Sequence, residues 1–218
     1  MNSTFKPMYK IVPEGEKDGI KIEHFTVSKM DSDRTTVRMC MHPEEYVPPG
    51  TYVKLIINGG IMMSDTLNEQ RTNYEVVWKA NGNVLIAGLG LGMILVPILE
   101  KPEVTSVTVI EKSEPVVFLV GVCGTFPNRK KLTIIRDDIF EWKPPVGIKY
   151  ETIYFDIWEN ICGDNLPEIT KLKRKFARSL NRANPKAKSW MGAWEEYRLR
   201  SQARRERAYE RVWGHPPW

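Results

Sequence analysis

Short apolar runs alternate with stretches of helical spacing along most of the chain after residue 80. The runs are rich in Val and Ile and predict buried strands, and the stretches between them predict amphipathic helices. The predicted strands are residues 83–87, 104–110, 132–135, 152–155 and 189–191. The predicted helices are residues 93–99, a helix that begins after Ser113, residues 166–181 and residues 194–212. This alternation predicts a parallel sheet with helices on both faces, as in a Rossmann-like α/β fold.

The first 80 residues follow a different pattern. Partly alternating, β-branched runs separated by turn residues predict a small antiparallel unit of three or four strands, followed by a short helix over residues 72–80. The predicted strands of this unit are residues 25–28, 36–41 and 52–57. We therefore divide the chain into three parts: an N-terminal β unit and linker (1–80), a Rossmann-like domain (81–195), and a basic C-terminal helix with a tail (196–218).

Length and composition change this picture little. The 218 residues suffice for one α/β domain with an appendage. No apolar run approaches the roughly 20 residues that cross a bilayer, and residues 1–10 lack a signal pattern, so we expect a cytoplasmic protein with no membrane segment. The three cysteines have no CxxC spacing and the three histidines are scattered, so we expect neither disulfides nor a metal site.

Charge is distributed unevenly. Residues 171–218 contain 14 Lys or Arg and 4 Asp or Glu, whereas the rest of the chain is acidic overall. Two readings stay open. The basic helices and their aromatics bind the phosphates and bases of a nucleic acid, or they form a solvated face with the aromatics buried against the sheet. The interleaved aromatic residues are Trp190, Trp194, Tyr197, Tyr209 and Trp213.

The first predicted strand of the domain runs into a glycine-rich turn. Gly88, Gly90 and Gly92 alternate with leucines, and a predicted helix follows. Glycine lets a ligand approach the backbone closely, and the start of a helix offers free N–H groups. In open parallel sheets ligands bind beyond the carboxyl ends of the strands, so this turn is a candidate ligand site.

Acidic residues follow the next three strands. Glu111 ends the second strand, 19 residues after Gly92, where a carboxylate accepts hydrogen bonds from ribose hydroxyls. Asp138 follows the third strand and can accept from an exocyclic amine, while Ile139 offers apolar contact to a purine. Asp156 follows the fourth strand. We expect these side chains to meet the glycines at one edge of the sheet.

The glycine spacing distinguishes two nucleotide-type ligands. The dinucleotide pattern requires a small residue three positions after the second glycine, and that position is Met93. An acid-lined edge also suits a cationic sulfonium better than a pyrophosphate. The residues therefore favour S-adenosylmethionine over NAD.

The order of these motifs resembles the class I S-adenosylmethionine-dependent methyltransferases, and within them the spermidine synthase-like branch. That branch also has a small N-terminal β unit and a linker, whose place residues 60–74 occupy. Residues 156–168 are similar to small, uncharacterised methyltransferase-like proteins of bacteria and phages. The resemblance covers roughly residues 50–195.

The resemblance implies a role for each matching position. The three glycines would pass the amino-acid part of the cofactor, Glu111 would bind its ribose, and Asp138 with Ile139 would bind its adenine. Asp156 would face the acceptor as the catalytic residue. The linker residues that would close over the site are Asp65, Thr66 and Asn73.

Two departures from the branch shape the functional expectation. Spermidine synthases carry an acid in the glycine loop, where this chain has Leu91, and the run at residues 156–160 keeps one acid and lacks the proline. We expect methyl transfer to an unidentified acceptor. The alternatives are aminopropyl transfer, or an accessory protein that binds S-adenosylmethionine or nucleic acid without catalysis. The usual last two strands are missing, so strands of the N-terminal unit or a second subunit, in a homodimer, would cover that sheet edge.

Overall fold

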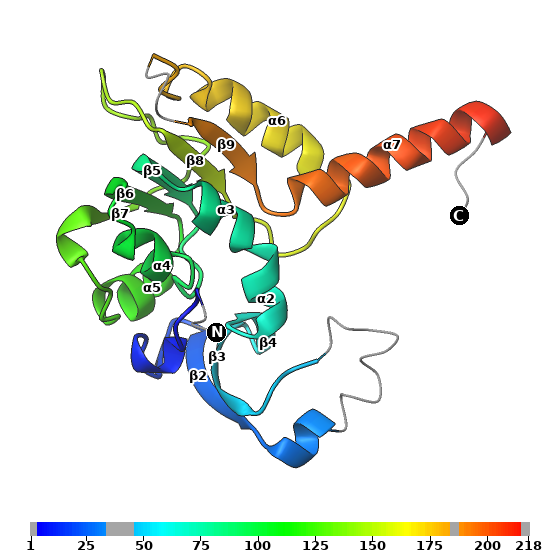
Figure 1. Cartoon of the computed structure of the whole chain (residues 1–218). Coiled ribbons are helices and arrows are strands. Elements are labelled where there is room, and N and C mark those ends of the chain that lie inside the picture. Colours follow the sequence, from blue (N-terminus) through cyan, green and yellow to red (C-terminus); the bar gives the residue numbers. More distant parts are fainter. Residues whose placement is uncertain (1–3, 34–45, 184–187, 215–218) are drawn as a thin grey trace.

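The computed structural model describes residues 4–33, 46–183 and 188–214, which form two separate sheets (Figure 1). One is a four-stranded antiparallel sheet near the amino terminus, with strand order β1-β2-β3-β4. The other is a five-stranded parallel sheet with order β7-β6-β5-β8-β9. The predicted Rossmann-like fold with a small N-terminal β unit is confirmed. The strand expected at residues 36–41 lies outside the described residues.

The N-terminal sheet follows a short 3₁₀ turn, η1 (Met8–Lys10). Its four strands are β1 (Gly15–Lys17), β2 (Ile20–Val27), β3 (Gly50–Ile57) and β4 (Gly60–Ser64). Strands β3 and β4 are joined by Asn58 and Gly59, which both have positive φ, at 49° and 82°. Asn-Gly is the pair that favours such a two-residue hairpin turn, so this connection is explained by local sequence.

Two short helices, α2 (Leu67–Thr72) and α3 (Tyr74–Lys79), replace the single helix expected over residues 72–80. Asn73 separates them with φ −99° and ψ 1°. It is buried, its Nδ2 donates to the Glu69 carbonyl at 3.1 Å, and its Oδ1 accepts from the Tyr154 hydroxyl at 3.2 Å. No residue of α2 is buried, so the apolar pattern gave no signal for it.

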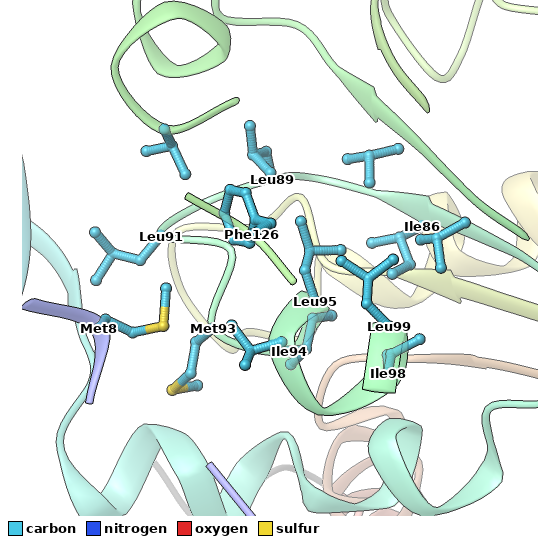
Figure 2. Close-up of a cluster of buried hydrophobic side chains, with 14 of the residues drawn as sticks. Met8, Ile86, Leu89, Leu91, Met93, Ile94, Leu95, Ile98, Leu99 and Phe126 are labelled. Carbon is cyan, nitrogen blue, oxygen red and sulfur yellow. The ribbon is translucent and has the colours of Figure 1, made fainter. Parts of the chain in front are cut away.

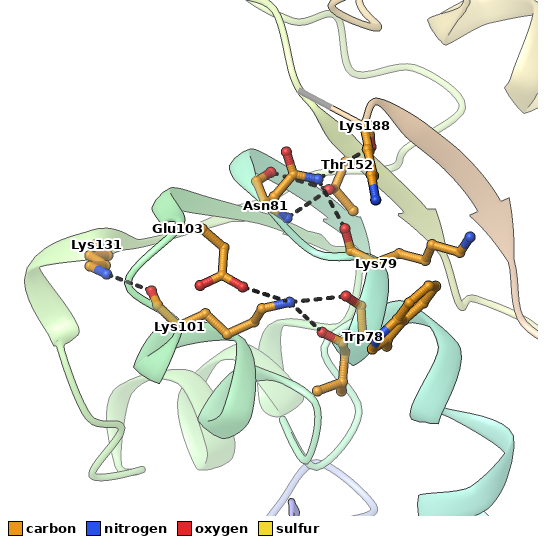
Figure 3. A network of polar contacts seen from close by, with 9 residues as sticks. Trp78, Lys79, Asn81, Lys101, Glu103, Lys131, Thr152 and Lys188 are labelled. Atoms are coloured by element: carbon orange, nitrogen blue, oxygen red, sulfur yellow. Dashed lines mark hydrogen bonds and ion pairs between the residues drawn. The ribbon is translucent and has the colours of Figure 1, made fainter. Parts of the chain in front are cut away.

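A polar network holds the end of α3 against the sheet (Figure 3). The Lys101 ammonium donates to the carbonyls of Val77 and Trp78 at 2.9 and 3.1 Å, and it lies 3.3 Å from a Glu103 carboxylate oxygen. A lysine at these carbonyls satisfies the last turn of a helix. The network therefore fixes the linker from the sheet edge opposite the glycine turn.

The parallel sheet separates two hydrophobic cores. Along β5, Val84 and Ile86 pack into one core and Leu85 and Ala87 into the other, as the two-residue period of a strand requires. Figure 2 shows the first core around Met8 and the helix after the glycine turn. The five strands are β5 (Gly82–Ala87), β6 (Val104–Glu111), β7 (Leu132–Arg136), β8 (Thr152–Phe155) and β9 (Trp190–Ala193).

Helices cover both faces of this sheet, with bounds close to those predicted (Figure 1). The helices on the first core are α4 (Leu95–Glu100), α5 (Glu114–Val116) and a continuing π-helical turn, η3 (Val117–Val122). The 3₁₀ turn η4 (Arg129–Lys131) precedes β7. Those on the second core are α6 (Asn165–Phe176) and α7 (Glu196–Trp213). The predicted cap is confirmed, because Ser113 Oγ accepts from the Val116 N–H at 3.4 Å.

The outer edge of β9 corrects one expectation. Strands β1 to β4 pair with one another in their own sheet, so the idea that they continue the parallel sheet at this edge is wrong. The covering of the edge by a second subunit stays a prediction. No helix within the described ranges has the length and apolar character needed to cross a bilayer.

Candidate functional site

The glycine turn lies between β5 and α4, against the end of β8. Gly88 has φ +94°, and a Cβ built on it would overlap the backbone oxygen of Asp156. A side chain at position 88 is therefore excluded by geometry and by space. The Gly88 N–H donates to the Ile110 carbonyl at 2.9 Å, and the Asp156 N–H donates to the Ala87 carbonyl at 2.8 Å. These bonds bring the ends of three strands together at the turn.

The Glu111 carboxylate ends β6 and holds the turn in place. Its Oε2 accepts from the Leu89 N–H at 2.8 Å, and its Oε1 accepts from the Ser113 N–H at 2.7 Å. A carboxylate oxygen has room for a second hydrogen bond. Glu111 can therefore position the glycine turn and still accept from two further hydroxyl groups.

Asp138 and Ile139 follow β7 and form the next part of the wall. The Asp138 carboxylate accepts from Lys112 Nζ at 2.8 Å and from the Phe140 N–H at 2.9 Å, and the lysine above all lowers its pKa. Ile139 is buried, and Phe140 packs partly against the same core. An ionised acceptor beside apolar side chains suits a flat, amine-bearing ring.

Asp156, after β8, has a different environment. No group in the described part of the chain donates a hydrogen bond to its carboxylate. Burial, with a smaller contribution from the charge of Glu69, raises the pKa of Asp156 to about 7. Burial also raises the pKa of Glu69 itself. A carboxyl group with a pKa near neutrality can take up or release a proton under ordinary conditions.

These groups surround one cavity of about 430 Å³, within the range of small-molecule sites. Seven of the ten predicted site residues line it: Gly88, Gly90, Glu111, Asp138, Ile139, Asn73 and Asp156. The N-terminal sheet closes the cavity with Leu55, Ile57, Met62 and Met63, and the wall near Asp156 also includes Trp158, Glu159, Glu168 and Trp194.

The other three predicted residues lie outside this lining and support the framework. Gly92 packs on Phe126, because a Cβ at Gly92 would meet that ring at 2.6 Å. The Asp65 carboxylate accepts from the backbone N–H groups of Met8 and Val53 at 3.0 and 2.6 Å, and burial raises its pKa. Thr66 precedes α2 and its Oγ1 is hydrogen-bonded to Ser64 Oγ at 3.0 Å. Their contact with a cofactor stays a prediction.

The lining also includes residues that the sequence reasoning did not assign to the site, and three of them bear on its shape and chemistry. The Met63 sulfur, on β4, accepts from the Leu91 N–H at 3.4 Å and so covers the glycine turn. Glu69 lies on the unpredicted helix α2. Trp194 was treated as part of the basic segment, yet it lines the cavity, and its buried Nε1 has no hydrogen-bond partner among the described residues. Only Trp194 carried a signal, because it follows a predicted strand as Asp156 does.

In comparisons with known proteins, the chain matches solved structures only. No protein-family model matches it, and no curated protein matches its sequence. The plantazolicin methyltransferase BpumL in complex with SAH aligns with 50% of this chain at 20% identity and a TM-score of 0.35. The CcbJ methyltransferase from Streptomyces caelestis aligns with 53% at 17% identity and a TM-score of 0.39. The spermidine synthase from Thermotoga maritima aligns with 78% at 13% identity and a TM-score of 0.43.

The alignments cover only part of these proteins. This chain spans 39% of the length of BpumL, 45% of CcbJ and 52% of the spermidine synthase. The neighbours include methyltransferases and a spermidine synthase. At these low identities the similarity is one of chain fold.

Proposed function

We propose that the protein is an S-adenosylmethionine-dependent methyltransferase that binds its cofactor at the glycine turn. In this proposal Glu111 holds the ribose, Asp138 and Ile139 hold the adenine, and Asp156 lies on the acceptor side. The proposal is carried by one observation, which is that the ends of β5, β6, β7 and β8 bring these groups to a single cavity of about 430 Å³.

The residues fit the ribose and adenine of this cofactor. Each Glu111 oxygen accepts one backbone N–H, which leaves both oxygens able to accept from a ribose hydroxyl. Asp138 can accept from the adenine amine, with Ile139 and Phe140 as the apolar wall. Gly88 lines the cavity, and its lack of a side chain is required by the nearby backbone oxygen of Asp156.

The charge of the lining also favours a sulfonium over a pyrophosphate. Seven carboxylates line the cavity against one lysine, Lys112, which is already paired with Asp138. A cation gains from this field, whereas two phosphates would be repelled. The lining acids are Glu69, Glu111, Asp137, Asp138, Asp156, Glu159 and Glu168.

When bound, the cofactor supplies an already activated methyl group, so the protein needs no nucleophile of its own. The tasks of the chain are to orient the acceptor and exclude water. Asp156 is placed to accept a hydrogen bond from an acceptor N–H or O–H and to take its proton, because its pKa of about 7 leaves it partly ionised at neutral pH. Met62 and Met63 shield the cavity from the side of the N-terminal sheet.

Calorimetric titration with S-adenosylmethionine, S-adenosylhomocysteine and NAD tests the cofactor assignment. We expect both sulfur nucleosides to bind and NAD to bind at least tenfold more weakly. Glu111→Gln should weaken the sulfur nucleosides about tenfold or more, whereas Glu141→Gln, an exposed acid outside the cavity lining, should leave them unchanged. Absence of binding by both sulfur nucleosides contradicts the proposal, and tighter binding of the decarboxylated cofactor would favour aminopropyl transfer.

The pH dependence of these titrations tests the place of Asp156. Its raised pKa means that the carboxyl becomes ionised as the pH rises through about 7. The affinity for the cationic cofactor, relative to the affinity for its neutral thioether product, should therefore rise several-fold between pH 6 and pH 8. Asp156→Asn should abolish this gain, and a gain that persists in the variant places the titrating group elsewhere.

A further inference from the structure

A second hollow lies beside α6 and α7, away from the sheet. It is a groove of about 510 Å³. Its lining residues are Leu166, Pro167, Thr170, Lys171, Arg174, Arg200 and Arg207. Four of these seven side chains are cationic and exposed, so the groove faces solvent with a concentrated positive charge.

The two helices keep most of this charge unneutralised. Helix α6 carries four basic residues and one acid, and α7 carries six arginines and three glutamates. Arg200 Nε donates to Glu196 at 2.7 Å, but Arg174 and Arg207 lie beyond ion-pair distance of any carboxylate in the described ranges. Lys173 of α6 and Glu196 of α7 form an ion pair at 2.9 Å between the two helices, but Arg174 and Arg207 have no such partner in the described ranges. Their charge suits an anionic ligand in the groove better than a second copy of α7.

Helix α7 also presents aromatic rings to solvent as it extends away from the sheet (Figure 1). Tyr197 and Trp213 are 84% and 65% exposed, so the reading in which the aromatics are buried is wrong for them. Trp190 and Trp194, in contrast, pack against the core beside the sheet. Exposed rings between arginines provide stacking surfaces for unpaired bases.

Residues that line the groove adjoin residues that line the cavity at two places. Leu166 and Pro167 line the groove and directly precede Glu168, which lines the cavity. Lys171 also lines the groove, and its Nζ lies 5.2 Å from the ring centroid of Phe140, which lines the cavity. A chain held in the groove would therefore lie next to residues that line the cavity.

We propose that the groove binds the phosphates of a single-stranded nucleic acid, and that the acceptor is an exocyclic amine of one of its bases, inserted beside Asp156. This inference rests on the proposed function and names its substrate. A paired and stacked base cannot enter a cavity of about 430 Å³ that also holds the cofactor, so the strand is single or locally opened.

The groove and the cavity carry opposite charges and would therefore bind different parts of the strand. Cations of the groove attract phosphates, while the carboxylates of Asp156, Glu159 and Glu168 repel them and accept hydrogen bonds from an amine. The amine nitrogen forms the new bond to the methyl carbon as the carbon–sulfur bond breaks, with its electron pair left on sulfur. The proton that the amine loses passes to the Asp156 carboxylate.

Fluorescence anisotropy with labelled oligonucleotides and the full chain tests the groove. Four phosphate contacts predict that log affinity falls with log salt with a slope of about −3 for a single strand. Arg174→Gln with Arg207→Gln removes two of the four contacts and should reduce the slope by about 1.4 and weaken binding at low salt about tenfold. The matched control removes two exposed lysines away from the groove, Lys29→Gln with Lys130→Gln, and should change neither value.

The base composition of the oligonucleotide tests whether the acceptor is an exocyclic amine. A mixed-sequence strand should bind several-fold tighter than oligouridine, which has no exocyclic amine, and Asp156→Asn should remove this preference. A comparison of RNA and DNA strands of the same sequence shows which of the two nucleic acids binds more tightly. An equal loss in both variant pairs, or tighter binding of a blunt duplex, overturns the inference. If no strand binds while the cofactor titration succeeds, this inference fails alone; if the titration fails, the proposed function fails with it.

Discussion

In the proposed function the cavity has a cofactor end, around Glu111 and Asp138, and an acceptor end, around Asp156, and these three carboxylates differ in their hydrogen bonds. At the cofactor end, the oxygens of Glu111 and Asp138 accept backbone N–H groups, and Lys112 lowers the pKa of Asp138. At the acceptor end, Asp156 has no hydrogen-bond donor in the described chain, its pKa is raised to about 7, and the buried Nε1 of Trp194 has no partner there either. At the first end the protein itself supplies hydrogen-bond donors to the carboxylates, and at the second end the described residues supply none to Asp156.

In the proposed function, this difference corresponds to a preorganised binding end and a reactive end. Carboxylates that are already hydrogen-bonded contribute to folding and hold their geometry before a ligand arrives. Unpartnered polar groups in a buried place destabilise the fold and gain partners only when a ligand supplies them. Substitutions at the two ends should therefore change stability in opposite directions.

Gly88→Ala should have the largest effect on stability, because Gly88 lies against the Asp156 backbone where the two ends of the cavity meet. The new Cβ would overlap the Asp156 backbone oxygen at a φ of +94°. We expect a loss of about 3 kcal/mol or more in unfolding free energy, measured by denaturant titration. Gly147→Ala is the matched control, since Gly147 has φ +84° and open space around it. It should lose only about 1 kcal/mol, and equal losses would show that overlap with Asp156 is unimportant.

Asp156→Asn should stabilise the protein above neutral pH. A carboxyl whose pKa is raised by folding costs nothing below its unfolded value and destabilises progressively as the pH rises from about 4 through about 7. The variant should gain about 2–4 kcal/mol at pH 8 and little at pH 4. Denaturant titrations at both values check this, with the exposed Asp164→Asn as the control. A gain independent of pH would contradict the assignment.

Glu111→Gln should have the opposite sign. Its amide has a single oxygen, so one of the N–H groups of Leu89 and Ser113 would face an NH2 group. We expect a loss of about 1–3 kcal/mol, similar at pH 6 and pH 8. Thermal unfolding of this variant beside Glu141→Gln measures the effect, and no difference between the two would mean that the cofactor end is not preorganised.

Trp194→Phe should have the smallest effect on folding. The change removes an N–H that has no partner in the described chain, which offsets the loss of ring volume, so stability should stay within about 1 kcal/mol. Trp190→Phe is the control, because the Trp190 ring stacks on Tyr154 with centroids 6.0 Å apart and its loss has no such offset. A larger loss for Trp194→Phe than for Trp190→Phe would indicate a hidden partner of the indole.

The sequence predicted that the residues of the proposed cofactor end lie together, because the signals for their positions are local. Each strand appears as an apolar run, and the carboxyl ends of parallel strands lie at one edge of the sheet. Gly88, Glu111 and Asp138 could therefore be predicted to lie close together. The strand order with β5 between β6 and β8 then follows from the usual connections of such sheets.

The Asp156 end of the cavity, and the part of the wall that the N-terminal sheet and α2 supply, depend on contacts that no local pattern encodes. Met63 reaches the glycine turn from a separate sheet, and Glu69 lies on a helix without a buried face. Asp65 was expected to close over the site because of its place in the linker, but its carboxylate accepts two backbone N–H groups inside the N-terminal unit. Whether such an acid faces a ligand or the backbone is decided by tertiary packing alone.

The position of β8 beside β5 has a consequence for the time course of folding. Val84 pairs with Thr152, so the two central strands meet only after a loop of more than sixty residues has closed. Contacts this distant in sequence form slowly. Asp156 comes to the glycine turn through the same pairing, so we expect it to join the glycines and Glu111 late in folding.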